Sequence, residues 1–165
     1  MTPLRTALAS LTAIAVVLLS SGVASAALGV EEPRWIWPGG VASVLREFER
    51  PPHPYGPGHR GIDIPVTGGV ALAPADGVVA FSGFVVDRSL LTIDHGGGLV
   101  STLEPVDDPP PAGTAVSQGQ VLGPVSAGGH VGDDTLHLGA RLDGEYIDPL
   151  ALLGVLERPV LLPCC

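Results

Sequence analysis

Three side chains that lie far apart in the sequence have the types and spacing of a metal site. His59 and Asp63 stand four residues apart with Gly61 between them, and His137 follows much later in the chain. In an extended strand, residues four apart project from the same side, so His59 and Asp63 would face together. Two imidazoles and one carboxylate can fill three tetrahedral positions around zinc and leave the fourth for water or substrate. The spacing therefore predicts a zinc site of the catalytic type.

The segments that must bring these residues together have the pattern of β-strands. Leu136 and Leu138 flank His137, which predicts a strand with the leucines on a buried face and the imidazole on the other. From Gly69 onward, short runs rich in Val and Leu alternate with glycine-containing turns. The expected strands cover residues 70–73, 78–81, 90–93, 99–103, 121–125 and 136–142, with Asp143-Gly144 as a hairpin turn. We predict an all-β fold, a compact sandwich or barrel of short antiparallel strands with little helix.

Segments outside these strands leave alternatives open. Trp35 and Trp37 are either core anchors or a platform for a substrate, and the large apolar area of an indole favours the core. Residues 41–48 fit either a short helix or a strand. Residues 149–153 are expected to close the domain, with a helical turn.

The start of the chain has the features of an export signal. Arg5, an apolar run over residues 7–20 and Ala24-Ser25-Ala26 have the order of a signal peptide, assigned to residues 1–26. The alternative is an uncleaved membrane anchor, but the run is shorter than the roughly 20 residues that span a bilayer. We therefore expect a secreted, cell-wall-associated protein that is not embedded in the membrane. Its parts would be a short segment 27–34, one domain over 35–153 and a tail over 154–165.

Charge and cysteine usage exclude some classes of protein. The chain has 17 acidic and 8 basic residues, a formal net charge of −9, which argues against nucleic acid as a partner. It contains no lysine, which a lipoyl-type carrier would need for its cofactor. Cys164 and Cys165 are neighbours, and the geometry of a disulfide disfavours a bond between them. They are either exposed thiols or links to another chain, so the oligomeric state is left open.

A series of short motifs points to one family. The motifs are Gly58-His59-Arg60-Gly61-Ile62-Asp63, Pro74-Ala75-Asp76-Gly77, Asp94-His95-Gly96-Gly97-Gly98, Gly119-Gln120-Val121-Leu122-Gly123, Leu136-His137 and Tyr146-Ile147-Asp148-Pro149-Leu150. In type, order and approximate spacing they resemble the LytM/lysostaphin family of zinc metallopeptidases, over residues 35–153. The resemblance implies a LytM-type domain with one Zn²⁺ per chain, bound by His59, Asp63 and His137. It also implies hydrolysis of peptidoglycan peptides, either stems or cross-bridges, at the surface of a bacterial cell.

The sequence departs from this family at both histidines that usually assist catalysis. The family's His-x-His is Thr135-Leu136-His137 here, and its Tyr-x-His-Leu aligns with Leu103-Glu104-Pro105-Val106, so Thr135 and Pro105 stand at the two positions. Three residues are candidate replacements. Glu104 adjoins a lost position but is also interpretable as a solvated loop acid, and His130, in a glycine-rich loop, is equally interpretable as a surface residue. Thr135 can donate a hydrogen bond but cannot act as a base at neutral pH.

Two functions follow from these residues. The first is a secreted zinc metalloendopeptidase that cuts peptidoglycan peptides through a metal-activated water. The second is a catalytically impaired module that retains zinc and binds the cell wall or regulates another hydrolase, with a regulatory protein as partner. The complete ligand set favours the enzyme, because degenerate activators of this family commonly lose metal residues. The peptide bond that is cut is left open.

Overall fold

The computed structural model describes residues 35–53, 55–126 and 128–153, which form strands joined by short turns. The nine strands are β1 (Gly61–Pro65), β2 (Val70–Leu72), β3 (Gly77–Val85), β4 (Arg88–Asp94), β5 (Leu99–Glu104), β6 (Ala115–Val116), β7 (Val121–Pro124), β8 (Thr135–Leu142) and β9 (Glu145–Ile147). The only helix in this part of the chain is the 3-10 turn η1 (Pro149–Ala151). The predicted all-β fold with little helix is confirmed.

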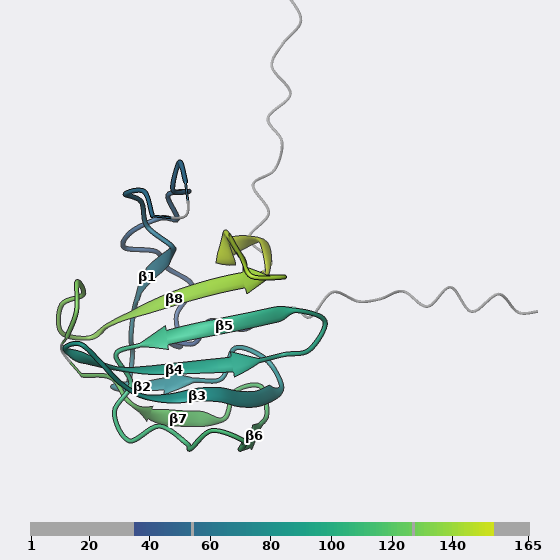
Figure 1. The fold of residues 1–165 in the computed structure, drawn as a ribbon. Helices are drawn as coiled ribbons and strands as arrows, with labels where there is room; N and C mark the ends of the chain where they lie inside the picture. Colours follow the sequence, from purple (N-terminus) through teal and green to yellow (C-terminus); the bar gives the residue numbers. More distant parts are fainter. Residues whose placement is uncertain (1–34, 54, 127, 154–165) are drawn as a thin grey trace, which may run out of the picture. The chain divides into compact units, whose positions relative to one another are not determined.

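Seven strands make one antiparallel sheet in the order β1-β8-β5-β4-β3-β6, with β9 paired to β8 (Figure 1). β2 and β7 pair with each other in a second, two-stranded sheet. Ala71 and Leu122 from the small sheet belong to the same buried cluster as Ile93 and Leu103 from the large one. The hydrophobic core therefore joins the two sheets, as in a sandwich.

The pairing of β1 with β8 separates the core from the face that carries the polar residues. Ile62 lies opposite Leu138 and Ile64 opposite Leu136, and all four side chains are fully buried. Asp63 lies directly opposite His137 between these pairs. Because side chains alternate across a strand, Asp63 and His137 share the other face of the sheet. The leucines that flank His137 thus fix the register that brings it to Asp63.

The segments before β1 and after β9 differ in part from the expectations. Trp35 is a core residue, as predicted, with 2% of its surface exposed, and its backbone N–H donates to the Leu152 carbonyl. Residues 41–48 are neither helix nor regular strand. They run beside β1, where Arg46 bridges Asp63 and Glu49 bridges His59, so both interpretations of this segment were wrong. The predicted turn at Asp143-Gly144 is confirmed, since both residues have positive φ between β8 and β9.

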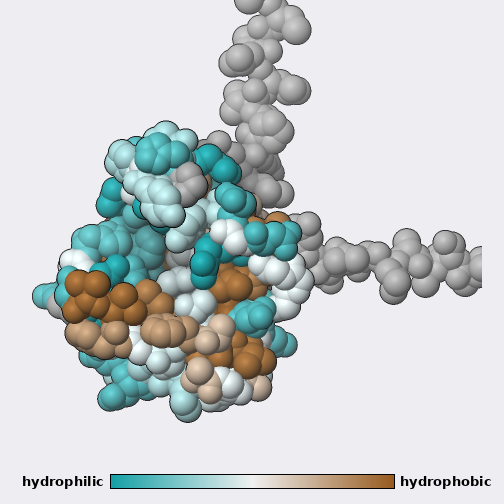
Figure 2. Space-filling model, in the orientation of Figure 1, coloured by the Kyte–Doolittle hydropathy of each residue, from teal (hydrophilic) through white to brown (hydrophobic). Residues whose placement is uncertain are grey.

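The expected signal peptide and segment 27–34 lie outside the described residues, as does the tail with both cysteines. Within the described ranges, no helix has the length and hydrophobicity needed to cross a membrane. On the face drawn in Figure 2, hydrophobic side chains gather over the lower strands, whereas the surface above them is hydrophilic. Val78, Phe81 and Phe84 of β3 are among the large hydrophobic side chains that are exposed.

Candidate metal centre

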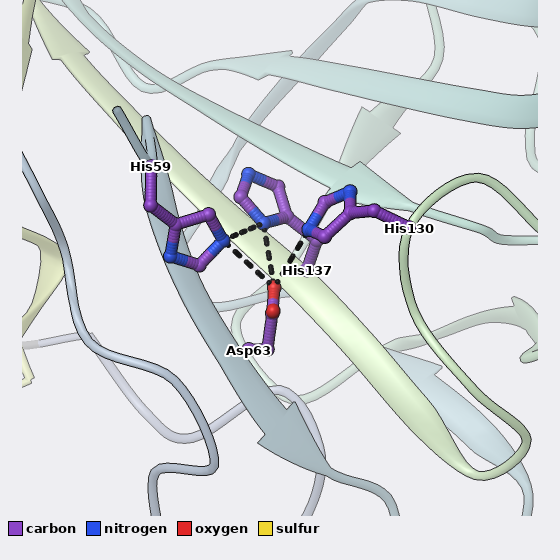
Figure 3. Close-up of side chains that lie close together, drawn as sticks. All are labelled: His59, Asp63, His130 and His137. Carbon is purple, nitrogen blue, oxygen red and sulfur yellow. Dashed lines mark hydrogen bonds and ion pairs between the residues drawn. The ribbon is translucent and has the colours of Figure 1, made fainter. Parts of the chain in front are cut away.

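Four side chains converge at one point on the polar face of the sheet: His59, Asp63, His130 and His137 (Figure 3). One possible ligand atom from each lies within 4.8 Å of all the others. Asp63 Oδ1 is central, at 3.0 Å from His59 Nε2, 2.8 Å from His137 Nδ1 and 3.1 Å from His130 Nε2. His59 Nε2 and His137 Nδ1 are 3.1 Å apart. The three residues predicted as ligands are therefore in direct contact.

Backbone pairing on both edges of β1 holds His59 and Asp63 in place. On one edge, Asp63 is paired with His137 of β8. On the other, the Asp63 N–H donates to the Arg46 carbonyl, and His59 exchanges two backbone hydrogen bonds with Glu49. Gly61 lies between the two ligands, where a Cβ atom would come within 2.7 Å of His137 Nε2. The missing side chain at this position makes room for the His137 ring.

The tautomer of His59 follows from its second ring nitrogen. His59 Nδ1 lies 2.7 Å from the backbone carbonyl oxygen of Glu47. A carbonyl only accepts, so Nδ1 carries a proton, and Nε2 is the ring nitrogen directed at the cluster. Fixing a ligating imidazole through its other nitrogen is the usual arrangement at protein metal sites. The sequence gives no sign of this contact, because the acceptor is a backbone atom.

Asp63 is held in its ionised form. Burial opposes ionisation of this carboxyl group, but the hydrogen bond with His137 and the charges of His137, His59 and His130 outweigh burial, so the pKa of Asp63 lies below its usual value of 3.8. Its side chain is 8% exposed. The cluster therefore has a buried negative charge at its centre at neutral pH.

The donor set fits a divalent cation. Ligand bonds of 2.0 to 2.2 Å in a tetrahedral site place neighbouring ligand atoms about 3.3 Å apart, close to the separations found here. The His59 lone pair faces the Asp63 carboxylate at 3.0 Å, a contact that is repulsive unless a proton or a cation lies between them. Imidazole and carboxylate donors together suit zinc and neighbouring transition metals. His59, Asp63 and His137 can hold such an ion.

His130 reaches the same cluster from the loop between β7 and β8. Its ring packs edge-on against those of His59 and His137, with centroid separations of 5.4 and 5.0 Å. Unlike the other three residues it is solvent-exposed, with 36% of its side chain accessible. Of the three residues considered as replacements for the assisting histidines, it alone belongs to the cluster.

Glu104 ends β5 and is not a solvated loop acid, so that interpretation was wrong. It is 7% exposed, and its carboxylate receives a hydrogen bond of 3.1 Å from Arg88 Nη2. Arg88 Nε lies 3.1 Å from the other oxygen as an ion pair that is not aligned as a hydrogen bond. Arg88 also packs against Gly129 of the His130 loop, where a Cβ would collide with Arg88 Cδ. The Glu104–Arg88 pair therefore supports the loop that carries His130.

The remaining histidine and hydroxyl candidates lie apart from the cluster. Thr135 starts β8, and its hydroxyl donates to the Asp133 carbonyl at 3.3 Å. His95 Nδ1 donates to the Asp76 carbonyl at 2.7 Å and Nε2 accepts from the buried hydroxyl of Ser101 at 2.8 Å. His95 thus has a structural role, tying the β4–β5 turn to the start of β3.

Comparisons with known proteins agree with this geometry. The uncharacterized protein Rv2891 of Mycobacterium tuberculosis is 34% identical over 119 residues, which are 67% of this chain and 47% of that protein. The chain thus spans about half the length of the curated relatives it matches. A crystal structure from Pseudomonas aeruginosa assigned to peptidase M23 is 26% identical, with a TM-score of 0.56, over 77% of this chain and 53% of that one.

A zinc-containing peptidase from Vibrio cholerae has the same fold, with a TM-score of 0.54 and 20% identity, over 69% of this chain and 37% of that one. The model for peptidase family M23 matches residues 57–149, a range that contains all four clustered residues. This confirms the resemblance to LytM-type peptidases noted in the sequence. The chain belongs to peptidase family M23.

Proposed function

We propose that this protein is an exported zinc metalloendopeptidase that hydrolyses peptide bonds in the stems or cross-bridges of peptidoglycan. The observation that carries the proposal is the contact of His59, Asp63 and His137 at one point, with an exposed imidazole beside them. Membership of a peptidase family supports the reaction class. The signal-peptide pattern at the start of the chain supports export to the cell wall.

Each clustered residue has a separate task in this proposal. A zinc ion held by His59, Asp63 and His137 would polarise the peptide carbonyl and activate a water. Asp63 supplies the negative charge, and the Glu47 carbonyl keeps the His59 ring turned toward the cluster. His130 would take the proton that the attacking water loses and pass it to the leaving amine, since its solvent-exposed ring lies beside the three predicted ligands. It takes over the work of the two missing assisting histidines.

One observation favours the alternative, a zinc-retaining module that binds the wall or regulates another hydrolase. His130 Nε2 is as close to Asp63 as the predicted ligands are, so His130 can also act as a fourth ligand. Structural zinc sites have four protein ligands, whereas catalytic sites keep one position open. If His130 closes the site, the chain binds zinc and peptide without cutting.

The role of His130 separates the two functions. In the enzyme, His130→Ala should lower kcat on purified peptidoglycan by about a hundredfold or more while one zinc per chain is retained. If the protein is a binding module, the wild type cuts nothing, and His130→Ala weakens zinc binding or leaves one ligand position of the zinc open. Thr135→Val is the matched comparison, and it should retain hydrolysis because the Thr135 hydroxyl contacts the Asp133 carbonyl instead.

Two readouts make the outcome decisive. Release of new amine termini measures hydrolysis, and sedimentation with insoluble peptidoglycan measures binding. A zinc-loaded wild-type protein that releases no amines under any tested condition rejects the enzyme. If the zinc-loaded wild-type protein neither releases amines nor sediments with peptidoglycan, the alternative is rejected as well.

A further inference from the structure

A second polar site lies where β9 meets the segment before β1. It is an open pocket of about 490 Å³ lined by Arg50, Arg60, Glu145 and Tyr146, together with residues 51–53 and Gly144. The guanidinium carbon of Arg60 lies 5.6 Å from the centre of the Tyr146 ring, and that of Arg141 lies 5.9 Å from it. Three arginines therefore gather at this place in a chain with a net charge of −9.

The positive charge at this pocket is only partly neutralised. Glu145 is the one acidic residue that lines it. Among the described residues, neither Arg50 nor Arg141 forms an ion pair with a carboxylate, whereas Arg88 is paired with both Asp87 and Glu104. Tyr146, which lines the pocket, holds the Arg141 side chain beside it by a cation–π contact that leaves the guanidinium N–H groups of Arg141 available to a ligand, whereas Arg60 Nη2 donates to the Gly56 carbonyl at 3.0 Å. This arrangement favours an anionic group in the pocket.

The strand register places this pocket beside the metal centre. β1 pairs with residues 135–139 of β8 and β9 with residues 140–142, so both strands occupy one edge of β8, end to end. Arg141 and its partner Tyr146 are on the same face as His137, about 13 Å along the strand. On this face of β8, Gly139 is the residue between His137 of the metal centre and Arg141 beside the pocket, and its partner on β1 is Gly61. A peptide a few residues long can reach both.

We infer that this pocket is a subsite that binds a carboxylate group of the peptide substrate. A guanidinium matches a carboxylate in geometry as well as in charge, because its planar fork can donate two parallel hydrogen bonds. The inference rests on the proposed function, since it specifies the substrate as a peptide with a free carboxylate a few residues from the bond that is cut. Arg50, which lines the pocket, and Arg141, which Tyr146 holds beside the lining, supply the charge.

The test compares two peptides that differ only in carboxylates. Fluorescence anisotropy would measure binding of fluorescein-labelled Ala-Glu-Ala-Ala with a free C-terminus and of Ala-Gln-Ala-Ala with a C-terminal amide to the zinc-loaded protein. The acidic peptide should bind at least about tenfold more tightly, the usual effect of charge-assisted hydrogen bonds. The variant Arg50→Gln/Arg141→Gln should lose this preference. Arg46→Gln, at an exposed arginine outside the pocket, should keep it, and this variant matches the single variant Arg50→Gln in its change of charge.

Several results would overturn the subsite. These are equal affinity for the two peptides, a preference that survives in Arg50→Gln/Arg141→Gln, or no binding of either peptide up to millimolar concentration. The single variant Arg50→Gln tests the same claim without touching the Tyr146 contacts, and it should lose part of the preference. Mass spectrometry of the peptides afterwards reports separately whether they were cut. A carboxylate preference without cleavage rejects hydrolysis and keeps the subsite, and cleavage without preference does the reverse.

Discussion

Two glycines that face each other across β1 and β8 should respond very differently to the same substitution. Gly61 and Gly139 are direct partners in the ladder. A Cβ at Gly61 would collide with the Leu138 carbonyl oxygen, and it would lie 2.7 Å from His137 Nε2 and 2.8 Å from His137 Cε1. A Cβ at Gly139 would find its neighbours at 3.4 to 3.8 Å, which are ordinary contacts. Gly61→Ala should therefore disturb the metal centre, and Gly139→Ala should not.

The size of the effect follows from the contact with the carbonyl. Relieving it requires β1 and β8 to separate by about 1 Å, and overpacking of this kind costs roughly 1 to 3 kcal/mol. For a domain of this size that corresponds to a fall in Tm of about 4 to 12 °C. The same shift moves the His137 ring relative to His59 and Asp63, and disturbing the support of a ligand typically lowers metal affinity by 10- to 100-fold.

Thermal unfolding of the metal-free proteins and competition for zinc with a chromophoric chelator would measure the two effects separately. The account predicts lower Tm and weaker zinc binding for Gly61→Ala and near wild-type values for Gly139→Ala. If Gly61→Ala binds zinc and unfolds as the wild type does, the packing of His137 against Gly61 is refuted. Equal losses in both variants would show that any side chain on this face is harmful and would also refute the argument.

Two further predictions concern stability. Burial lowers the pKa of His95 below its usual value of 6.5, so this side chain takes up a proton less readily in the folded protein than in the unfolded chain. The free energy of unfolding should therefore be highest above about pH 6.5 and should fall as the pH drops toward the pKa of His95 in the folded protein. Urea unfolding between pH 5 and 8 should show this fall in the wild type and a smaller one in His95→Gln, and parallel pH profiles would contradict it. Arg88→Met leaves the Glu104 carboxylate, whose side chain is 9% exposed, without its cation and should cost about 1 to 3 kcal/mol. Arg88→Met/Glu104→Leu should recover part of that loss in the same urea assay, and an additive loss in the double variant would count against the pair.

The sequence pattern predicted the strands and the convergence of His59, Asp63 and His137 for one reason. The alternation of Leu136, His137 and Leu138 indicates both a strand and the face on which the imidazole lies, and that alternation is what sets the β1–β8 register. Strand ends were less accurate: β3 extends to Val85, whereas the expected strand stopped at Phe81, because Ser82 and Gly83 interrupt the apolar run without breaking the pairing with β4.

The features that were missed depend on contacts between distant segments. Residues 41–48 have no periodicity of their own because they bond to β1 as an irregular edge. Glu104 looked solvated because its partner, Arg88, is 16 residues earlier on another strand. His130 was a candidate only through its residue type, and its contact with Asp63 depends on how the loop before β8 folds back over the sheet. No local pattern indicates such contacts.

Zinc content after removal of loosely bound metal shows whether His59 and His137 bind the ion. The wild-type protein would be dialysed to constant metal content and analysed by inductively coupled plasma mass spectrometry beside His59→Ala, His137→Ala and the matched variant His53→Ala, whose loop imidazole is outside the cluster. We expect one zinc per chain in the wild type and in His53→Ala, and almost none in His59→Ala and His137→Ala. Full zinc retention in both His59→Ala and His137→Ala would contradict it.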